Sequence, residues 1–468
     1  MEHYNQQILA YWDGSELAAG NREKKANMVE AMAALKFAAP VQDHEELEEV
    51  AKICMLYQTL RKQGVESFVA PFAGHKVLHV AWSVTERCGH LCHHCSTQGS
   101  LAQDKQSVPW DKLEQALREM APYTQMLYIS CEGDPFYYED RSATLVRDIS
   151  DVTGTIVKLG FPHLSLQSLA PATDKLGIMA KLLAVLPDPK SRPNFFFPQL
   201  SFNLYPPRAG LNMRSMNNEH GTWQQFFVPG IADSELKDWI VELVKSLGDK
   251  SIARSGADQT VTERLSHYLQ EVKAAILAYA SRGYPIVFEI RGDVYSSIHN
   301  LQTLDEILDM LVANLAQEHP EIPFPKCEHC DKVHYAKEFA PIVPLGRATQ
   351  LFPNGAQEEV GFFAKHVAEN PYRYLCDNWQ SWGAVTIDTK GFPQLCYSNL
   401  ALTPQARTTQ GPNLYSGKGF AAIREFYLQV WRDRARFLLQ HLPELVRQRP
   451  NSQHCPLCSY KQTLAHTT

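Results

Sequence analysis

The chain has 468 residues, of which 44% are hydrophobic and 21% are charged. This is a globular composition and excludes a disordered or fibrous chain. The formal net charge of −6 gives no electrostatic footprint for nucleic acid or an anionic membrane, so neither is expected as the main partner. The length indicates two or three domains, although an α/β barrel alone can take ~250 residues.

The compartment follows from the N-terminus and the cysteines. The N-terminal sequence lacks the basic and then apolar layout of a signal peptide, and no apolar run reaches the ~18 residues that cross a bilayer. We therefore expect a cytoplasmic protein in a reducing environment. There, the 11 cysteines are better interpreted as metal ligands than as disulfides.

Residues 1–75 are expected to form a helical extension. Between Glu45 and Arg61, apolar residues recur at steps of three and four, which predicts a helix with one buried face. No pattern in this stretch indicates chemistry, so we interpret it as a packing helix.

From about residue 77, short strand-like runs alternate with helical stretches. Six strands are predicted, at Val77–Val84, Met126–Cys131, Thr155–Leu159, Phe196–Tyr205, Pro285–Arg291 and Phe339–Pro344. Helices are predicted at Trp110–Met120 and at residues 173–186, 234–247, 261–282 and 302–317. Several strand runs are continuously apolar, as expected of parallel strands covered on both faces. The alternation favours an α/β fold, an open or closed parallel barrel whose reactive groups lie at the C-terminal ends of the strands.

Two parts of the chain depart from this alternation. The segment Pro206–Ser255 is interpreted equally well as a lid or substrate loop and as a surface insertion. Beyond Arg347 the alternation fades, which indicates a separate cysteine-bearing unit. The predicted domains are therefore residues 1–75, 76–347 and 348–468.

Cys88, Cys92 and Cys95 lie close together after the first predicted strand. Thiolates are ligands for iron–sulfur clusters or for zinc. Three ligands on a four-iron cluster leave one iron open, whereas a zinc site usually closes with a fourth ligand, which a neighbouring histidine would supply. The spacing alone favours an iron–sulfur cluster and leaves zinc as the alternative.

This Cys-x3-Cys-x2-Cys spacing resembles the signature of the radical S-adenosylmethionine (SAM) superfamily. The resemblance implies a partial (β/α)6 barrel and a [4Fe–4S] cluster whose open iron binds the amino and carboxylate groups of SAM. An electron from the cluster would cleave SAM to a 5′-deoxyadenosyl radical that abstracts hydrogen from a substrate. A reduced ferredoxin or flavodoxin is the implied electron donor. The chain departs from the family at His94, where an aromatic residue is usual.

The segment after the second predicted strand also matches the family. Cys131-Glu-Gly-Asp-Pro135 resembles the Gly-Gly-Glu-Pro segment that contacts the methionine amino group. The resemblance therefore assigns cofactor contacts to Glu132, Gly133, Asp134 and Pro135. Glycine lets the backbone approach a ligand closely, and the two carboxylates are suitable acceptors for an ammonium group.

Three polar residues lie on the later strands. Ser201 and Asn203 are two residues apart and point to one face. The family often contacts SAM from this strand, so both are assigned to cofactor binding, with satisfied polar groups inside the barrel as the alternative. Glu289 is costly to bury without a partner and is the candidate catalytic or substrate-contacting residue. Its alternative is a structural pairing near Arg291.

The C-terminal cysteines resemble a second family element. Cys376-x14-Gly391-x4-Cys396, followed by Cys455-Pro-Leu-Cys458, resembles the SPASM extension of many radical SAM enzymes. The resemblance implies that these four cysteines ligate one auxiliary [4Fe–4S] cluster in a small C-terminal iron–sulfur domain, as in the shorter twitch variants. A structural zinc on the same residues is the alternative.

Three functions follow from these patterns. The first is a radical SAM oxidoreductase that modifies a peptide or protein side chain by oxidation or cross-link formation, because SPASM extensions are widely associated with peptides. The second is the same chemistry on a small molecule such as an aminosugar or nucleotide. The third is a zinc-stabilised binding protein. The role of Cys327 and Cys330 stays open between a separate metal site and exchange with Cys455 and Cys458.

Overall fold

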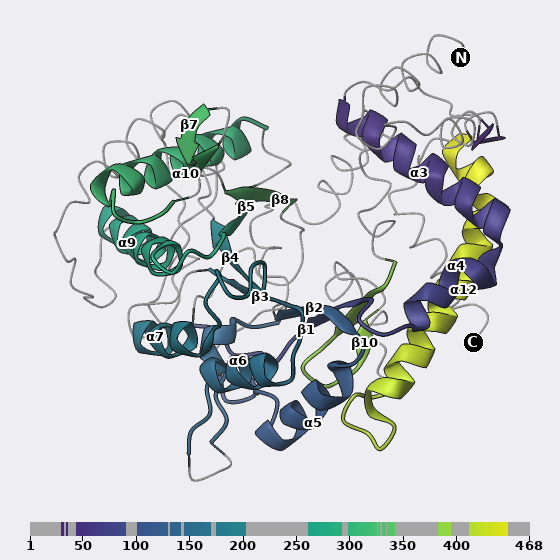
Figure 1. Ribbon diagram of the computed structural model, residues 1–468, viewed down its shortest axis with the longest axis horizontal. Helices are drawn as coiled ribbons and strands as arrows, with labels where there is room; N and C mark the ends of the chain where they lie inside the picture. The colour runs from purple at the N-terminus through teal and green to yellow at the C-terminus, as the bar shows by residue number, and fades with distance from the viewer. Residues whose placement is uncertain are drawn as a thin grey trace. The chain divides into compact units, whose positions relative to one another are not determined.

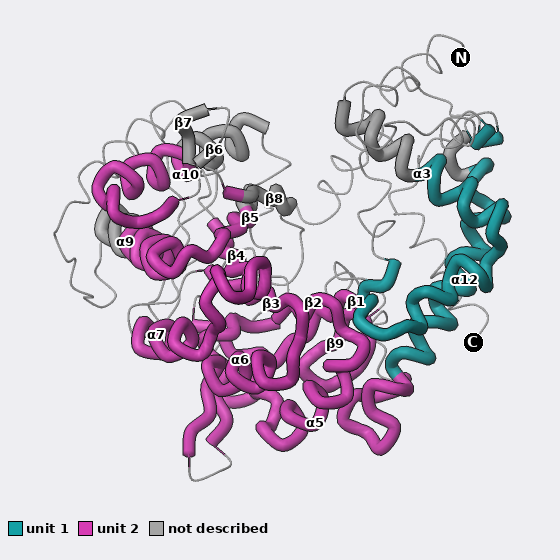
Figure 2. Tube along the Cα trace, in the orientation of Figure 1, with its two compact units in different colours: residues 1–77, 357–384, 423–468 teal, residues 78–356, 385–422 magenta. Residues whose placement is uncertain are grey.

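The computed structural model describes part of the chain: residues 30–31, 34–35, 44–89, 101–129, 132–141, 145–169, 175–202, 261–292, 298–324, 326–327, 330–333, 335–341, 382–394 and 411–447. The chain divides into two compact units (Figure 2). The smaller unit comprises residues 1–77, 357–384 and 423–468, and the larger comprises residues 78–356 and 385–422. The predicted domain boundary at 347/348 lies outside the described residues.

A mostly parallel sheet runs through the larger unit (Figure 1). In the described residues it has eight strands in the order β10-β9-β1-β2-β3-β4-β5-β8. Neighbours from β1 to β8 in this order pair in parallel, whereas β9 and β10 pair antiparallel. The strands are β1 Leu78–Trp82, β2 Thr124–Ile129, β3 His163–Ser168, β4 Phe196–Phe202, β5 Val287–Gly292, β8 Ala336–Pro341, β9 Ala384–Ile387 and β10 Pro393–Gln394.

Helices connect the parallel strands, as a parallel arrangement requires. They are α5 Trp110–Met120, α6 Ile149–Lys158, α7 Leu176–Val185, α9 Val261–Ala280 and α10 Ile298–Glu318. This confirms the α/β class, together with the predicted strands at the positions of β1, β2, β4, β5 and β8. The predicted helix at 234–247 lies outside the described residues, and closure into a partial barrel stays a prediction. Among the described helices, none has the length and apolar character of a membrane span.

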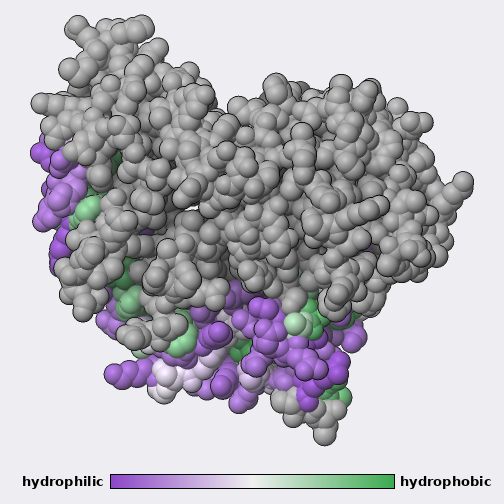
Figure 3. All heavy atoms as spheres, turned by 180° about the vertical axis from the view of Figure 1, so that it is seen from behind, coloured by the Kyte–Doolittle hydropathy of each residue, from purple (hydrophilic) through white to green (hydrophobic). Residues whose placement is uncertain are grey.

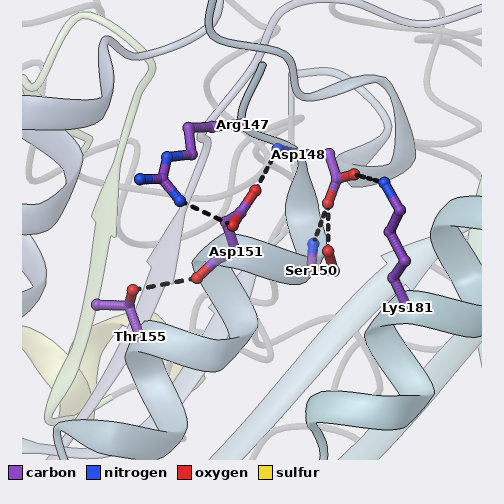
Figure 4. Close-up of polar contacts among 6 residues, drawn as sticks. All are labelled: Arg147, Asp148, Ser150, Asp151, Thr155 and Lys181. Atoms are coloured by element: carbon purple, nitrogen blue, oxygen red, sulfur yellow. Dashed lines mark hydrogen bonds and ion pairs between the residues drawn. The ribbon is translucent and has the colours of Figure 1, made fainter. Parts of the chain in front are cut away.

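The strand predicted at Thr155–Leu159 is wrong, because its first four residues belong to α6 and Leu159 caps that helix. Asp148 starts the helix: its side chain accepts a hydrogen bond from the Ser150 N–H at 2.9 Å, and the Asp151 carboxylate accepts one from the Asp148 N–H at 3.0 Å (Figure 4). This reciprocal cap outweighs the strand preference of the β-branched residues that follow. The third strand is β3, which begins at His163.

The two faces of the sheet differ in polarity. Because side chains alternate along a strand, the pairing register assigns each residue to one face. One face is apolar and at most 2% exposed at Val80, Leu127, Leu164, Leu200 and Phe288. The opposite face carries the polar residues Tyr128, Ser165, Gln167, Gln199, Ser201 and Glu289.

Helix α9 covers the apolar face. The ring of Tyr279 lies 5.9 Å from that of Phe196, and the ring of Tyr268 lies 6.2 Å from that of Phe202. Gln167, Gln199, Ser201 and Glu289 on the opposite face are nevertheless buried. A buried polar face requires hydrogen-bonding partners, so this face is the one suited to a polar ligand.

The smaller unit joins the N-terminal and C-terminal parts of the chain. It contains α3 His44–Gln63, α4 Val65–Val69, the short 3-10 helix η2 Ala70–Ala73 and most of α12 Gly419–Arg447. The predicted packing helix is confirmed as α3, whose Ile53, Cys54, Tyr57 and Leu60 are buried. Arg432 and Arg436 of α12 each bind Glu66 of α4, at 2.9 and 3.1 Å.

Candidate functional site

Cys88 lies on the loop that follows β1, at the C-terminal edge of the parallel strands. Its side chain is buried. Hydrogen bonds join the backbone of this loop to the segment preceding α5: the Glu86 N–H donates to the Gln106 carbonyl at 2.8 Å, and the Val108 N–H donates to the Val84 carbonyl at 2.9 Å. The loop that carries the first predicted ligand is therefore held in place by backbone bonds.

The segment after β2 packs directly against the same loop. The Asp134 N–H donates to the Arg87 carbonyl at 3.1 Å. A Cβ atom on Gly133 would lie 2.5 Å from the Arg87 carbonyl oxygen and 2.6 Å from that of Thr85. A residue with a side chain does not fit here, so glycine is required for the approach of these two predicted site segments. Pro135 begins the short 3-10 helix η3 Pro135–Tyr137 and is buried.

Tyr137, which was not predicted as a site residue, packs beside Gly89 of the same loop. A Cβ atom on Gly89 would lie 2.3 Å from the Tyr137 hydroxyl oxygen, so the ring fills the space beside this residue. The Lys175 ammonium lies 4.8 Å from the centroid of the Tyr137 ring. Gly133 and the ring of Tyr137 thus both pack against the described part of the Cys88 loop.

The Asp134 carboxylate ties the ends of β2 and β3 together. It accepts hydrogen bonds from the Phe136 N–H at 2.9 Å, the Ser168 hydroxyl at 2.6 Å and the Leu169 N–H at 3.3 Å. The residue is only 5% exposed. These bonds fix the turn that presents Glu132 and Gly133.

Glu132 is bound by a residue far away in the sequence. Both the backbone N–H of Thr389, at 2.7 Å, and its hydroxyl donate to Oε2 of Glu132, across 257 residues of chain. Both residues are 8% exposed. Thr389 lies in the turn between β9 and β10, so this hairpin contributes directly to the site.

The neighbouring Asp388 has a perturbed titration. Its pKa is raised to about 6, chiefly because burial penalises the charged form, and the charge of Glu132 adds to the effect. A hydrogen bond from the Phe392 N–H to Oδ1, at 2.8 Å, opposes the shift. The second oxygen, Oδ2, accepts a hydrogen bond from Gln394 Nε2 at 2.9 Å.

Gly391, the glycine of the predicted C-terminal motif, forms part of the same hairpin turn. Its φ of +86° lies in the left-handed region, and a Cβ atom would lie 2.7 Å from the Tyr415 ring. Its N–H donates to the Asp388 carbonyl at 3.0 Å. The position therefore requires glycine on two grounds, backbone conformation and close packing.

A polar cluster spans three neighbouring strands on the polar face. Oε2 of Glu289 accepts hydrogen bonds from the Ser201 hydroxyl, at 2.7 Å, and from the Gln167 side-chain amide. The Gln167 amide nitrogen also lies 3.5 Å from the Ser201 hydroxyl. The structure thus brings two predicted site residues together and adds Gln167, which lies on β3, a strand that was not predicted at this position.

Several predicted site residues lie outside the described residues: Cys92, Cys95, Asn203, Cys376, Cys396, Cys455 and Cys458. Within the described residues, no group of three or more His, Cys, Asp or Glu side chains is arranged to hold a metal ion. Cys327 and Cys330 are paired positions of the two-stranded antiparallel sheet formed by β6 Lys326–Cys327 and β7 Cys330–Val333.

Comparison with known proteins gives only distant similarity. No family model and no curated protein matches the chain. Among solved structures it is similar to SuiB of Streptococcus suis bound to the precursor peptide SuiA, at 12% identity over 95% of this chain and 83% of that chain, with a TM-score of 0.33.

Two further solved structures are similar at the same level. SuiB bound to S-adenosylmethionine is 14% identical over 94% of this chain and 83% of that chain, with a TM-score of 0.32. HydG, a maturase of the [FeFe]-hydrogenase, is 11% identical over 82% of this chain and 66% of that chain, with a TM-score of 0.31. Likeness at these TM-scores does not establish a shared fold, so the function is inferred from the residues of this chain.

Proposed function

We propose that the protein is a radical SAM enzyme with its cofactor site at the C-terminal edge of β1 and β2. The observation that carries the proposal is the approach of Gly133 to the backbone of the Cys88 loop. The two sequence elements that resemble the family, the cysteine loop and the Glu-Gly-Asp-Pro segment, are adjacent in space, as a shared cofactor site requires. In the proposal Cys88, Cys92 and Cys95 hold a [4Fe–4S] cluster.

The residues present fit this group. The Cys88 thiol is buried and therefore shielded from water, and a thiolate is a suitable iron ligand. When bound, the cluster supplies the electron that cleaves SAM and so generates a hydrogen-abstracting radical. The chain's part is to bind, to orient and to exclude water, because a reactive radical must be kept from side reactions.

Each predicted cofactor residue has a role in this proposal. Glu132 accepts a hydrogen bond from the amino group of SAM, and Gly133 allows the backbone to approach it. Asp134 and Pro135 fix the turn that carries both residues. The family resemblance assigns Ser201 and Asn203 as further SAM contacts.

The polar face of the sheet is the proposed substrate side. Glu289 lies there with Gln167 and Ser201, all less than 9% exposed. A buried carboxylate with two donors on one oxygen is held in a fixed orientation, which suits it to accept a hydrogen bond from a substrate. Glu289 is therefore the proposed catalytic or substrate-contacting residue.

The C-terminal cysteines extend the proposal. Cys376, Cys396, Cys455 and Cys458 would ligate an auxiliary [4Fe–4S] cluster of SPASM or twitch type. The turn that contains Gly391, between the first two of these cysteines, lies in a hairpin of the central sheet. A SPASM-type element favours a peptide or protein side chain as the substrate, to be oxidised or cross-linked, with a reduced ferredoxin or flavodoxin as the electron donor.

Metal analysis and paired cysteine variants test this assignment. Anaerobically purified protein should be brown and carry about eight irons per chain if both clusters form. Cys92→Ala should abolish SAM cleavage, whereas Cys396→Ala should retain part of it and lose only the auxiliary iron. A colourless protein that contains zinc would contradict the proposal and support a zinc-stabilised binding protein.

A further inference from the structure

We propose that Thr389 is a positioning residue that holds Glu132 in the orientation needed to accept a hydrogen bond from the amino group of SAM. The inference rests on the proposed function, because it deepens the assignment of Glu132. It makes the turn of the β9–β10 hairpin part of the cofactor site, although this turn lies far beyond the cysteine loop in the sequence.

The geometry of the two donors of Thr389 supports this positioning role. The N–H and the hydroxyl of Thr389 both donate hydrogen bonds to the same oxygen, Oε2 of Glu132. A carboxylate has about four acceptor positions on its two oxygens. Two donors on one oxygen therefore hold that oxygen of the carboxylate in place.

The hairpin turn that carries Thr389 is itself fixed by backbone hydrogen bonds. The Asp388 N–H donates to the Phe392 carbonyl at 3.0 Å, the Gly391 N–H donates to the Asp388 carbonyl at 3.0 Å, and the Leu414 N–H donates to the Gly391 carbonyl at 2.8 Å. A donor on a turn held in this way keeps its direction. Thr389 thus acts on Glu132 from a rigid support, which preorganised binding requires.

The negative charge around Glu132 also supports this positioning role. Asp388 lies close enough for the charge of Glu132 to raise its pKa. Two neighbouring carboxyl groups repel each other, and a cation bound between them or beside them relieves that repulsion. The donors of Thr389 offset part of this repulsion by stabilising negative charge on Oε2 of Glu132.

The test compares two substitutions of the same residue. Thr389→Val removes the hydroxyl and keeps the backbone N–H, whereas Thr389→Ser keeps both the hydroxyl and the backbone N–H. Thr155→Val is the matched control, because its hydroxyl donates to the Asp151 carbonyl in α6 (Figure 4). SAM binding is measured by equilibrium dialysis on cluster-loaded, oxidised protein, so that no turnover is needed.

The expected result is about tenfold weaker SAM binding in Thr389→Val, the value for one hydrogen bond to a charged group. Thr389→Ser should bind within about threefold of the wild type, and Thr155→Val should match the wild type. Iron content should stay unchanged in all three. Wild-type affinity in Thr389→Val, or an equal loss in the valine and serine variants, would overturn the inference.

A double variant separates this inference from the proposed function. Thr389→Val should add no further loss to Glu132→Gln if the threonine acts only through the glutamate. Additive losses would overturn the positioning role while leaving the cofactor site in place. Failure of the iron-loaded wild type to bind SAM at all would overturn the proposed function, and the inference with it.

Discussion

Replacing Gly133 by alanine is expected to destabilise the segment that joins the two parts of the candidate site. The added Cβ atom would lie 2.5 Å from the Arg87 carbonyl oxygen, 2.6 Å from the Thr85 carbonyl oxygen and 2.8 Å from the Glu86 carbonyl carbon. All three are main-chain atoms. No change of side-chain rotamer relieves these overlaps, so either the Cys88 loop or the Glu132 turn must move.

The magnitude follows from these distances. Cβ atoms in proteins essentially never approach closer than 3.0 Å, and the shortest contact here falls about half an ångström inside that limit. Overpacking of this kind typically costs about 1–3 kcal/mol of unfolding free energy. Gly154→Ala is the control, because its nearest neighbours are Val185 side-chain atoms at 3.9 Å. This alanine should stabilise α6 by about 0.5–1 kcal/mol.

The assay has two readouts. Urea unfolding followed by circular dichroism gives the free energy of unfolding of each variant, and iron analysis after anaerobic reconstitution gives the occupancy of the cysteine loop. Gly133→Ala should lower both values, and Gly154→Ala should lower neither. A Gly133→Ala protein as stable as the wild type and with a full iron content would refute the close packing of the two segments.

Three further results are expected. Asp148→Ala should lower the unfolding free energy by about 1 kcal/mol in urea titration, because it removes the cap of α6, whereas Lys181→Ala, an exposed ion-pair partner of Asp148 at 3.2 Å, should change it little. The raised pKa of Asp388, from 3.8 to about 6, means that the folded state binds more protons than the unfolded state between these values. The free energy of unfolding, measured by urea titration at each pH, should therefore fall as pH rises from about 4 to 6. The fall should be up to about 3 kcal/mol larger than in the Asp388→Asn variant. Glu289→Gln should leave SAM cleavage in place and slow hydrogen abstraction from substrate, as seen by uncoupled 5′-deoxyadenosine formation.

The sheet was predictable where the sequence pattern is local. Short runs rich in apolar residues at β1, β2, β4 and β5 indicate buried strands, and the α3 helix follows from its periodic apolar face. The strand predicted at Thr155–Leu159 failed because β-branched residues favour strands only when no upstream cap decides otherwise. Asp148 and Asp151 supply that cap, because each side chain accepts a hydrogen bond from a backbone N–H at the start of the helix.

The site was predictable only in part, for a physical reason. Motif spacing locates Cys88 and the Glu132–Pro135 segment, because each is a short stretch of chain. The contact of Thr389 with Glu132 joins residues that no local pattern relates, and the partnership of Gln167 with Glu289 depends on strand order and register. Contacts of this kind become visible only when the fold is known.

The described residues on one face of the molecule present mainly polar side chains. The described part of the face in Figure 3 is mostly hydrophilic, with smaller apolar areas among the polar side chains. Large exposed apolar side chains in the described residues include Leu145 and Val146 on the loop before α6, and single residues of this kind are normal on a protein surface.

The central claim is that Cys88, Cys92 and Cys95 hold a cluster that cleaves SAM. Its most direct test is the release of 5′-deoxyadenosine by iron-loaded protein incubated anaerobically with SAM and dithionite, with Cys88→Ala as the paired variant. The wild type should form 5′-deoxyadenosine and the variant should form none. A wild-type protein that carries its full iron content and yet releases no 5′-deoxyadenosine would contradict the account.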